Sequence, residues 1–162
     1  MVGAVRDVAG FSAVLKWPND LLADGRKLAG VLAEVDIGSS GIVRAVVAGV
    51  GVNVTENAFP PELASMATAC EVIAGQPIER RRLLAAFLVH LGDRLDTPDP
   101  ELLAEYRAQL ATIGEAVRVD RPAGPIEGIA VDVDDLGGLV VETEAGSTVT
   151  ISAGDVVHLR PR

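Results

Sequence analysis

Two long apolar segments joined by four small residues are the feature that most constrains the fold of this chain. The segments LAGVLAEVDI (residues 28–37) and IVRAVVAGVGVNV (residues 42–54) flank Gly38–Gly41, and the sequence GSSG of this connection is typical of a hairpin turn. We therefore predict two antiparallel strands here. Because the second segment is almost entirely apolar, it predicts a strand that is covered on both of its faces.

The chain changes character at about Ile113. Before this residue, the strand-like segment AVLKW is combined with helical patterns in MVGAVRDVAG and IERRRLLAAFLVHLGDRL. After it, short β segments alternate with turns, which is typical of a small antiparallel barrel. We therefore predict an α+β fold, in which a mixed or antiparallel sheet with helices (residues 1–111) precedes a small C-terminal antiparallel β-barrel (residues 112–162).

Composition narrows the classes of function. Hydrophobic residues make up 49% of the 162 residues, which is typical of a globular chain with a core. The formal net charge is -9, and this acidic balance argues against a nucleic-acid partner. The longest apolar run, AVVAGVGV, is far shorter than the segment of about 20 residues that spans a bilayer, and residues 1–10 lack the pattern of a secretory signal. The single cysteine, Cys70, permits no internal disulfide and indicates a reducing cytoplasm.

A polar loop between two apolar segments is the first candidate site. Lys16 ends one predicted strand and Lys27 begins the next, so a short loop brings two cations to one end of the sheet, where they suit a carboxylate or a phosphate. Asn19 offers a donor and an acceptor, and Asp20 offers a carboxylate for a cation or a hydroxyl. Gly30 lets the backbone approach a bound group closely. A turn with solvated lysines is the alternative, because Asn-Asp and Asp-Gly are common turn sequences.

A strand with glycines at alternate positions is the second candidate site. Gly49, Gly51 and Asn53 share one face of the predicted strand, and glycines on one face indicate that something flat packs there. An adenine ring fits this description, and its amino group and ring nitrogen suit the amide of Asn53. The alternative is a helix that packs closely on the glycines, with Asn53 simply ending the strand.

The segments KWPNDLL, GRKLAGVLAE and GVGVNV, in this order and spacing, resemble the biotin protein ligases, also called biotin–[acetyl-CoA-carboxylase] ligases. The β-rich C-terminal segment is similar to the C-terminal domain of that family. The resemblance implies part of a catalytic domain like that of class II aminoacyl-tRNA synthetases. It also implies ATP-dependent activation of biotin to biotinyl-5′-AMP and transfer of the biotinyl group to a lysine of a biotin carrier protein of acetyl-CoA carboxylase.

The resemblance further implies which residues carry this chemistry. Magnesium would balance the charge of the departing pyrophosphate. Asp20 would either help to hold the metal through water or orient Lys16. The metal ligands themselves stay unknown. The implied catalytic residues are Lys16, Asp20 and Lys27, the implied biotin-binding residues are Lys27 and Gly30, and the implied nucleotide-binding residues are Lys16, Asn19, Gly51 and Asn53.

The chain also departs from the family pattern. Family members have a substantial catalytic segment before KWPND, with a Gly/Arg-rich loop that closes over the adenylate. We therefore expect a truncated chain that makes biotinyl-AMP far more slowly than a complete ligase. A non-catalytic remnant that binds adenylate or pairs through its sheet is the alternative, and a lipoate or octanoate ligase or transferase is less favoured. Because unpaired strand edges recruit other strands, we also expect a homodimer held mainly by residues within 28–53.

Overall fold

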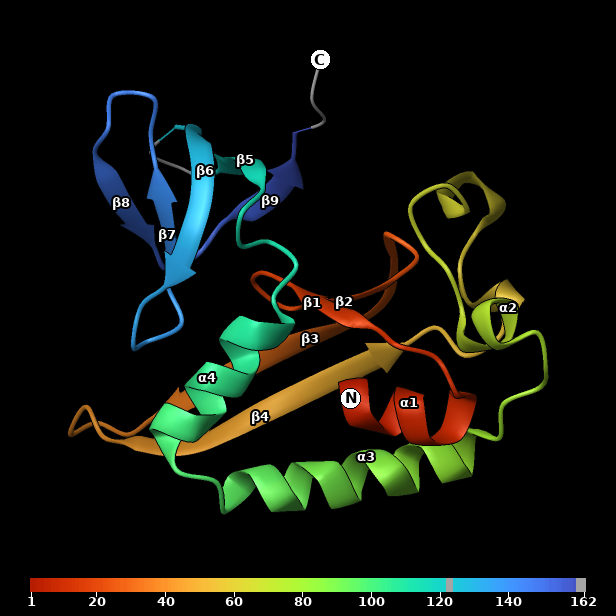
Figure 1. Cartoon of the computed structure of the whole chain (residues 1–162). Helices are drawn as coiled ribbons and strands as arrows, with labels where there is room; N and C mark the ends of the chain where they lie inside the picture. Colours follow the sequence, from red (N-terminus) through yellow and green to blue (C-terminus); the bar gives the residue numbers. More distant parts are fainter. Residues whose placement is uncertain (122–123, 160–162) are drawn as a thin grey trace. The chain divides into compact units, whose positions relative to one another are not determined.

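The computed structural model of this chain describes residues 1–121 and 124–159. They belong to two compact units (Figure 1). Unit 1 combines Met1–Ala13 with Asn19–Leu88, and unit 2 combines Val14–Pro18 with Val89–Arg162. The predicted domain boundary between residues 111 and 112 does not coincide with this division and stays a prediction.

Unit 1 is built on an antiparallel sheet with the strand order β2-β3-β4. The strands are β2 (Asp20–Ala23), β3 (Arg26–Ile37) and β4 (Val43–Val52). The pairing of β3 with β4 confirms the predicted hairpin.

The connection that was predicted to be a loop between Lys16 and Lys27 contains the additional strand β2. Its tight turn lies at Asp24 and Gly25, which adopt left-handed φ angles of 49° and 71°. Asp-Gly is a favoured pair for such a turn, and the turn folds β2 directly back onto β3. The turn interpretation of Asp24 and Gly25 is therefore confirmed.

Helices and short turns accompany this sheet. Gly10 ends the first helix in a left-handed conformation (φ 77°), and its N–H donates to the carbonyl of Arg6, as the sequence predicts for a C-terminal cap. Among residues 1–121 and 124–159, none of the helices has the length and apolar composition of a membrane-crossing segment. The helices are α1 (Val2–Ala9), α2 (Cys70–Ala74) and the first part of α3 (Arg80–Leu95), which belongs to this unit up to Leu88, with 3₁₀ turns at Glu56–Ala58 and Pro61–Leu63.

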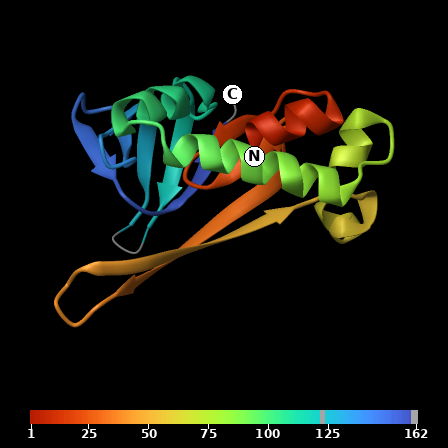
Figure 2. The same ribbon diagram turned by 90° about the horizontal axis from the view of Figure 1, so that it is seen from below.

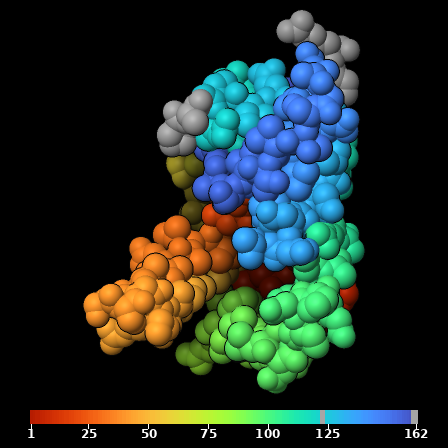
Figure 3. Space-filling model, turned by 90° about the vertical axis from the view of Figure 1, so that its left-hand side faces the viewer, coloured from red at the N-terminus to blue at the C-terminus, as the bar shows by residue number. Residues whose placement is uncertain are grey.

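The outer half of the β3–β4 hairpin is uncovered. Adjacent strand residues point to opposite faces, and Val46 and Val47 are 59% and 64% exposed, so both faces of β4 are open there. Figure 2 shows the hairpin turn reaching beyond the other elements of unit 1, and Figure 3 shows its atoms as an orange projection. The prediction that this strand is covered on both faces is wrong for these residues. An apolar segment indicates a surface that is more stable when it is covered. It does not indicate whether the covering group belongs to the described residues.

Unit 2 contains a second antiparallel sheet with the strand order β8-β7-β6-β5-β9. Apolar side chains alternate along its strands, and Val117, Val119, Leu139 and Val141 are completely buried. This sheet confirms the predicted β-rich C-terminal part, whereas its closure into a barrel stays a prediction. The elements are β1 (Val14–Lys16), α4 (Asp99–Gln109), β5 (Ala116–Asp120), β6 (Ile126–Val133), β7 (Leu139–Glu142), β8 (Thr148–Ile151) and β9 (Asp155–His158).

His158 makes the stability of the chain depend on pH. Burial, and then the positive charge of Lys16, lower the pKa of His158 from its ordinary value of 6.5, while Glu115 acts in the opposite direction. As the pH falls, His158 is therefore protonated at a higher pH in the unfolded chain than in the folded chain. We expect the free energy of unfolding to fall as the pH drops below about 6.5, whereas above that value His158 is neutral in both states and contributes nothing.

His158→Gln should remove this part of the loss. Thermal unfolding of both proteins between pH 7.5 and pH 5 provides the measurement. Parallel losses of melting temperature in the two proteins would show that other groups cause the acid sensitivity.

Candidate functional site

A β-bulge turns the lysine of the candidate site onto the same face as Gly30. The register of β2 and β3 shifts between Leu21 and Leu22, which makes Leu28 an additional residue of β3. In a regular strand, residues three positions apart point to opposite faces, so Lys27 would point away from the face of Gly30. The additional residue reverses this direction, as bulges commonly do near functional sites.

Three residues, one from each strand, lie in a row across the sheet of unit 1. Asp20 pairs with Gly30, and Gly30 pairs with Gly51. Directly paired residues of antiparallel strands share a face, so the Asp20 side chain lies on the face of Gly30. A Cβ atom on Gly30 would meet Asp20 Oδ1 and Lys27 Cε, each at 3.3 Å. Gly30 therefore provides the space that the Asp20 and Lys27 side chains occupy.

Asp20 and Lys27 form an ion pair in that space. Lys27 Nζ lies 2.5 Å from Asp20 Oδ1, and the side chains are 51% and 18% exposed, respectively. The same Asp20 oxygen is buried and makes no hydrogen bond among the described residues, so the ammonium group is what compensates its charge. The carboxylate thus orients Lys27, and the exposed side of the ammonium group stays accessible to an anion.

The two candidate asparagines are tied to the backbone of β3. Asn53 Nδ2 donates to the carbonyl of Lys27 at 3.3 Å, and the Asn53 backbone N–H donates to the carbonyl of Leu28 at 2.9 Å. Asn19 Nδ2 donates to the carbonyl of Val31 at 2.7 Å, which fastens the start of β2 to β3. Part of the hydrogen-bonding capacity of both amides is therefore used within unit 1.

The glycine face of β4 is open. A Cβ atom on Gly51 would meet no atom within 4 Å, and one on Gly49 would meet only the carbonyl of Leu32 at 3.8 Å. The alternative that a helix packs on these glycines is therefore wrong at Gly51 for the part of the chain that the structure describes. A flat group has direct access to this face.

Lys16 lies on β1, which belongs to unit 2, whereas Asp20 and Lys27 belong to unit 1. Its neighbour Trp17 is buried in the core of unit 2, and the charge of Lys16 reaches His158 of β9. The meeting of both lysines around one ligand stays a prediction.

Sequence reasoning did not identify Thr112 as a partner of this strand. The Trp17 backbone N–H donates to Thr112 Oγ1 at 3.0 Å, and Thr112 is completely buried. No local signal marks this threonine, because it lies 95 positions away along the chain.

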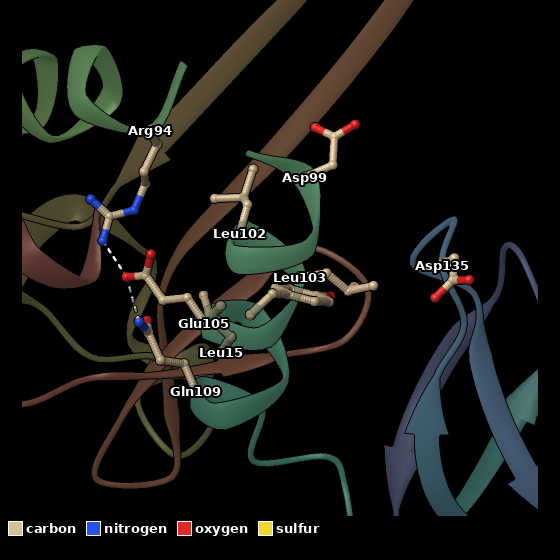
Figure 4. A pocket seen from close by; sticks show the side chains of 9 residues that line it. Leu15, Arg94, Asp99, Leu102, Leu103, Glu105, Gln109 and Asp135 are labelled. Carbon is tan, nitrogen blue, oxygen red and sulfur yellow. Dashed lines mark hydrogen bonds and ion pairs between the residues drawn. The ribbon is translucent and has the colours of Figure 1, made fainter. Parts of the chain in front are cut away.

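The residues that the structure describes form neither a metal centre nor an activated thiol. Among residues 1–121 and 124–159, no group of three His, Cys, Asp or Glu side chains is arranged to hold a metal ion. Burial raises the pKa of the Cys70 thiol, so this residue is a core residue and not an activated nucleophile. A cavity of about 430 Å³ beside α4 is lined by Arg94, Glu105 and Gln109, among others, but by none of the predicted site residues (Figure 4).

Two family models match separate parts of the chain. Residues 3–53 match the biotin/lipoate A/B protein ligase family, and residues 112–159 match the biotin protein ligase C-terminal domain. The first range contains every predicted site residue. The second range contains all five strands of the sheet of unit 2.

Curated proteins with similar sequences carry ligase names. The chain is 45% identical over 150 residues to the biotin–[acetyl-CoA-carboxylase] ligase of Mycobacterium tuberculosis, with 90% of this chain and 53% of that protein covered. It is 31% identical over 159 residues to the bifunctional ligase/repressor BirA of Bacillus subtilis, with 94% and 49% covered. The chain therefore spans about half the length of these relatives.

Solved structures with a similar fold include biotin protein ligase from Aquifex aeolicus. The apo structure superposes with a TM-score of 0.85 at 24% identity, covering 98% of this chain and 71% of that one. The structure of the same ligase in complex with biotin and ATP gives a TM-score of 0.80 at 26% identity, covering 99% and 67%.

A pair of glycine substitutions tests the row across the sheet. We expect Gly30→Ala to lower the free energy of unfolding by about 1 kcal/mol or more, because its methyl group would crowd the Asp20–Lys27 pair. Gly51→Ala is the matched control, since its methyl group would enter open space and should change the stability by less than about 0.5 kcal/mol. Urea unfolding of the three proteins measures both effects. Equal stabilities for the two variants would contradict the close packing above Gly30.

Proposed function

Because this chain belongs to the biotin protein ligase family, we propose that it takes part in the ATP-dependent activation of biotin to biotinyl-5′-AMP and in transfer of the biotinyl group to a carrier protein. The observation that carries this proposal is the Asp20–Lys27 pair above Gly30, beside the open face of Gly51. Such an arrangement sets an oriented cation next to a flat surface. It matches a substrate in which a carboxylate or phosphate is joined to an aromatic base.

Lys27 is the residue that we assign to the reacting groups. The carboxylate of biotin and the α-phosphate of ATP are both anionic and repel each other. The Lys27 ammonium group balances the charge that develops as the carboxylate oxygen bonds to phosphorus and pyrophosphate leaves. Asp20 acts as a positioning residue in this proposal, since it orients the ammonium group. Gly30, which we assign to biotin, has no side chain and so leaves room for the side chains of Asp20 and Lys27.

The adenine ring is assigned to the open face of β4. Gly51 offers a flat contact, and Asn53, which directly follows β4, keeps its side-chain oxygen and one amide hydrogen for the edge of the base. Lys16 and Asn19 are assigned to the nucleotide phosphates. The hydrogen bond from Asn19 to Val31 supports a role in shaping the loop as well.

Magnesium belongs to the proposal only as a companion of the nucleotide. The described residues provide no cluster of three metal-ligating side chains, and Asp20 is paired with Lys27. Because the Lys27 ammonium group compensates the Asp20 carboxylate, we assign no metal contact to Asp20, and the metal would be held mainly by the nucleotide phosphates and water.

The acceptor of the biotinyl group in this proposal is a lysine of the biotin carrier protein of acetyl-CoA carboxylase. The name of the Mycobacterium tuberculosis relative supports this assignment. The proposed location is the cytoplasm, and the free, buried thiol of Cys70 is consistent with a reducing compartment.

A second copy of this chain is the other partner in the proposal. The outer half of the β3–β4 hairpin exposes apolar side chains on both faces, and such a surface favours association with another chain. The residues involved are those of the predicted range 28–53.

Lys27→Ala tests the proposed activity. The chain is joined to the preceding half of the Mycobacterium tuberculosis relative, and biotin and nucleotide affinities are measured by calorimetric titration, with pyrophosphate release as the rate. We expect the chimera to form biotinyl-AMP. Lys27→Ala should weaken binding by about 1.5–3 kcal/mol, because a charge-assisted contact is lost.

Arg26→Ala is the matched control. It removes the neighbouring cation of β3, and adjacent residues point to opposite faces of a strand. Its affinities and rate should stay within a factor of two of the unsubstituted chimera. Unchanged affinities and rates for Lys27→Ala would remove Lys27 from the site, and a chimera without activity would overturn the proposed function.

Val47→Glu tests the proposed pairing. We expect the unsubstituted chain to behave as a dimer or larger species and the variant as a monomer, because a carboxylate on the hairpin opposes burial of this apolar surface. Light scattering after size exclusion measures the mass. Val157→Glu is the control, since Val157 is an exposed valine of β9 outside the hairpin. A monomeric unsubstituted chain at high concentration would contradict the proposal.

A further inference from the structure

Trp17 fastens the Lys16 strand to the sheet of unit 2. Its side chain is 2% exposed and packs in the core of that unit. Its indole Nε1–H donates to the carbonyl of Gly137 at 2.9 Å, and its backbone N–H donates to Thr112. The carbonyl of Leu15, two residues earlier, accepts the N–H of Ala111 at 2.8 Å. This short strand is therefore held by residues that lie about a hundred positions later in the sequence.

The acceptor carbonyl belongs to a tightly built turn, Asp134–Gly138, between β6 and β7. Asp134 Oδ1 accepts the N–H groups of Leu136 and Gly138 at 2.9 and 2.7 Å. Gly137 has a left-handed φ of 80°, a conformation that favours glycine. The Asp134 carboxylate thus fixes the direction in which the Gly137 carbonyl points.

Polar contacts also position this turn on the side that faces α4. Arg107 of α4 donates through Nε to Asp132 Oδ1 at 2.9 Å and through Nη2 to the carbonyl of Val133 at 2.5 Å. Figure 4 shows Asp135 on the turn and Leu15 among the side chains that line the cavity beside α4. On this side, the turn is therefore held by discrete hydrogen bonds from Arg107 to the residues that precede it.

We propose that Trp17 is a positioning residue for Lys16. Through the hydrogen bond from Trp17 to Gly137, the position of Lys16 at the nucleotide depends on the turn of residues 134–138. Leu15 and Lys16 are adjacent residues of β1 and point in opposite directions, and both Leu15 and Trp17 pack against the core of unit 2, so the Lys16 side chain points away from that core. The inference rests on the proposed function, because it assigns Lys16 to the nucleotide.

A second observation locates Lys16 by its charge. The pKa of His158 is lowered by burial and then by Lys16, so the ammonium group lies within electrostatic range of β9. The titration of His158 responds to the distance of Lys16 as well as to burial and to Glu115, so it adds a readout that does not depend on activity.

Trp17→Phe separates positioning from packing. The variant keeps an aromatic ring in the core but removes the Nε1–H donor. In the chimera described above, we expect at least a tenfold lower kcat for biotinyl-AMP formation, with the KM for biotin within a factor of two, since the biotin contacts are assigned to Lys27 and Gly30. In the chain alone, the His158 pKa, followed by NMR, should rise as Lys16 moves away.

Asp134→Ala tests the other half of the contact. Trp17 is the only tryptophan of the 162 residues, so its fluorescence reports on this contact directly. We expect Asp134→Ala to shift the emission of the chain to longer wavelengths and to lower the kcat of the chimera. Asp134→Asn retains an acceptor oxygen and should restore both. Leu136→Ala is the control in the same turn, because its side chain is 96% exposed.

Two results would overturn the inference. The first is a Trp17→Phe protein that folds and keeps its kcat within a factor of two, and the second is an Asp134→Ala protein with unchanged emission and kcat. Should Trp17→Phe not fold, the Asp134 series decides alone. An unsubstituted chimera without activity would refute the proposed function and this inference about Lys16, whereas either of the two results above, obtained with an active chimera, would refute the inference only.

Discussion

The register of β3 against its two neighbours is the constraint on which the candidate site depends. Pairing with β2 sets Asp20 opposite Gly30, and pairing with β4 sets Gly30 opposite Gly51. The bulge at Leu28 then turns Lys27 onto the same face. A shift of one residue in either pairing would move a member of this row to the other face of the sheet. The pairing of the backbones therefore determines which side chains of the candidate site lie on the same face of the sheet.

The Asp20–Lys27 pair is buried on the side of the carboxylate and open on the side of the ammonium group. Lys27 is half exposed, so the outer side of its ammonium group can meet an incoming phosphate or carboxylate while the inner side stays paired. Asp20 is mostly buried, and its Oδ1 makes no hydrogen bond among the described residues, so the carboxylate depends on Lys27 for compensation of its charge. A completely buried pair would be costly to separate, whereas an unpaired lysine would have no fixed direction.

The sequence predicted what local patterns determine. The hairpin of residues 28–54, the end of α1 at Gly10 and the change near Ile113 each follow from residues close together in the chain. The strand β2, the bulge at Leu28 and the contact between Trp17 and Thr112 do not, because they depend on which distant segments pair. The candidate residues were therefore found from loop composition and resemblance, but the ion pair that joins two of them required the backbone register.

The loop KWPND is continuous in sequence but divided in structure. Lys16, Trp17 and Pro18 belong to unit 2, and the next residue, Asn19, belongs to unit 1. The position of Asp20 depends on the register between β2 and β3. The position of the segment that carries Lys16 depends on the hydrogen bonds of Trp17 to Thr112 and Gly137. Within one short sequence motif, the two candidate residues therefore depend on two different cores, and a substitution in either core can be tested for its effect on one of them alone.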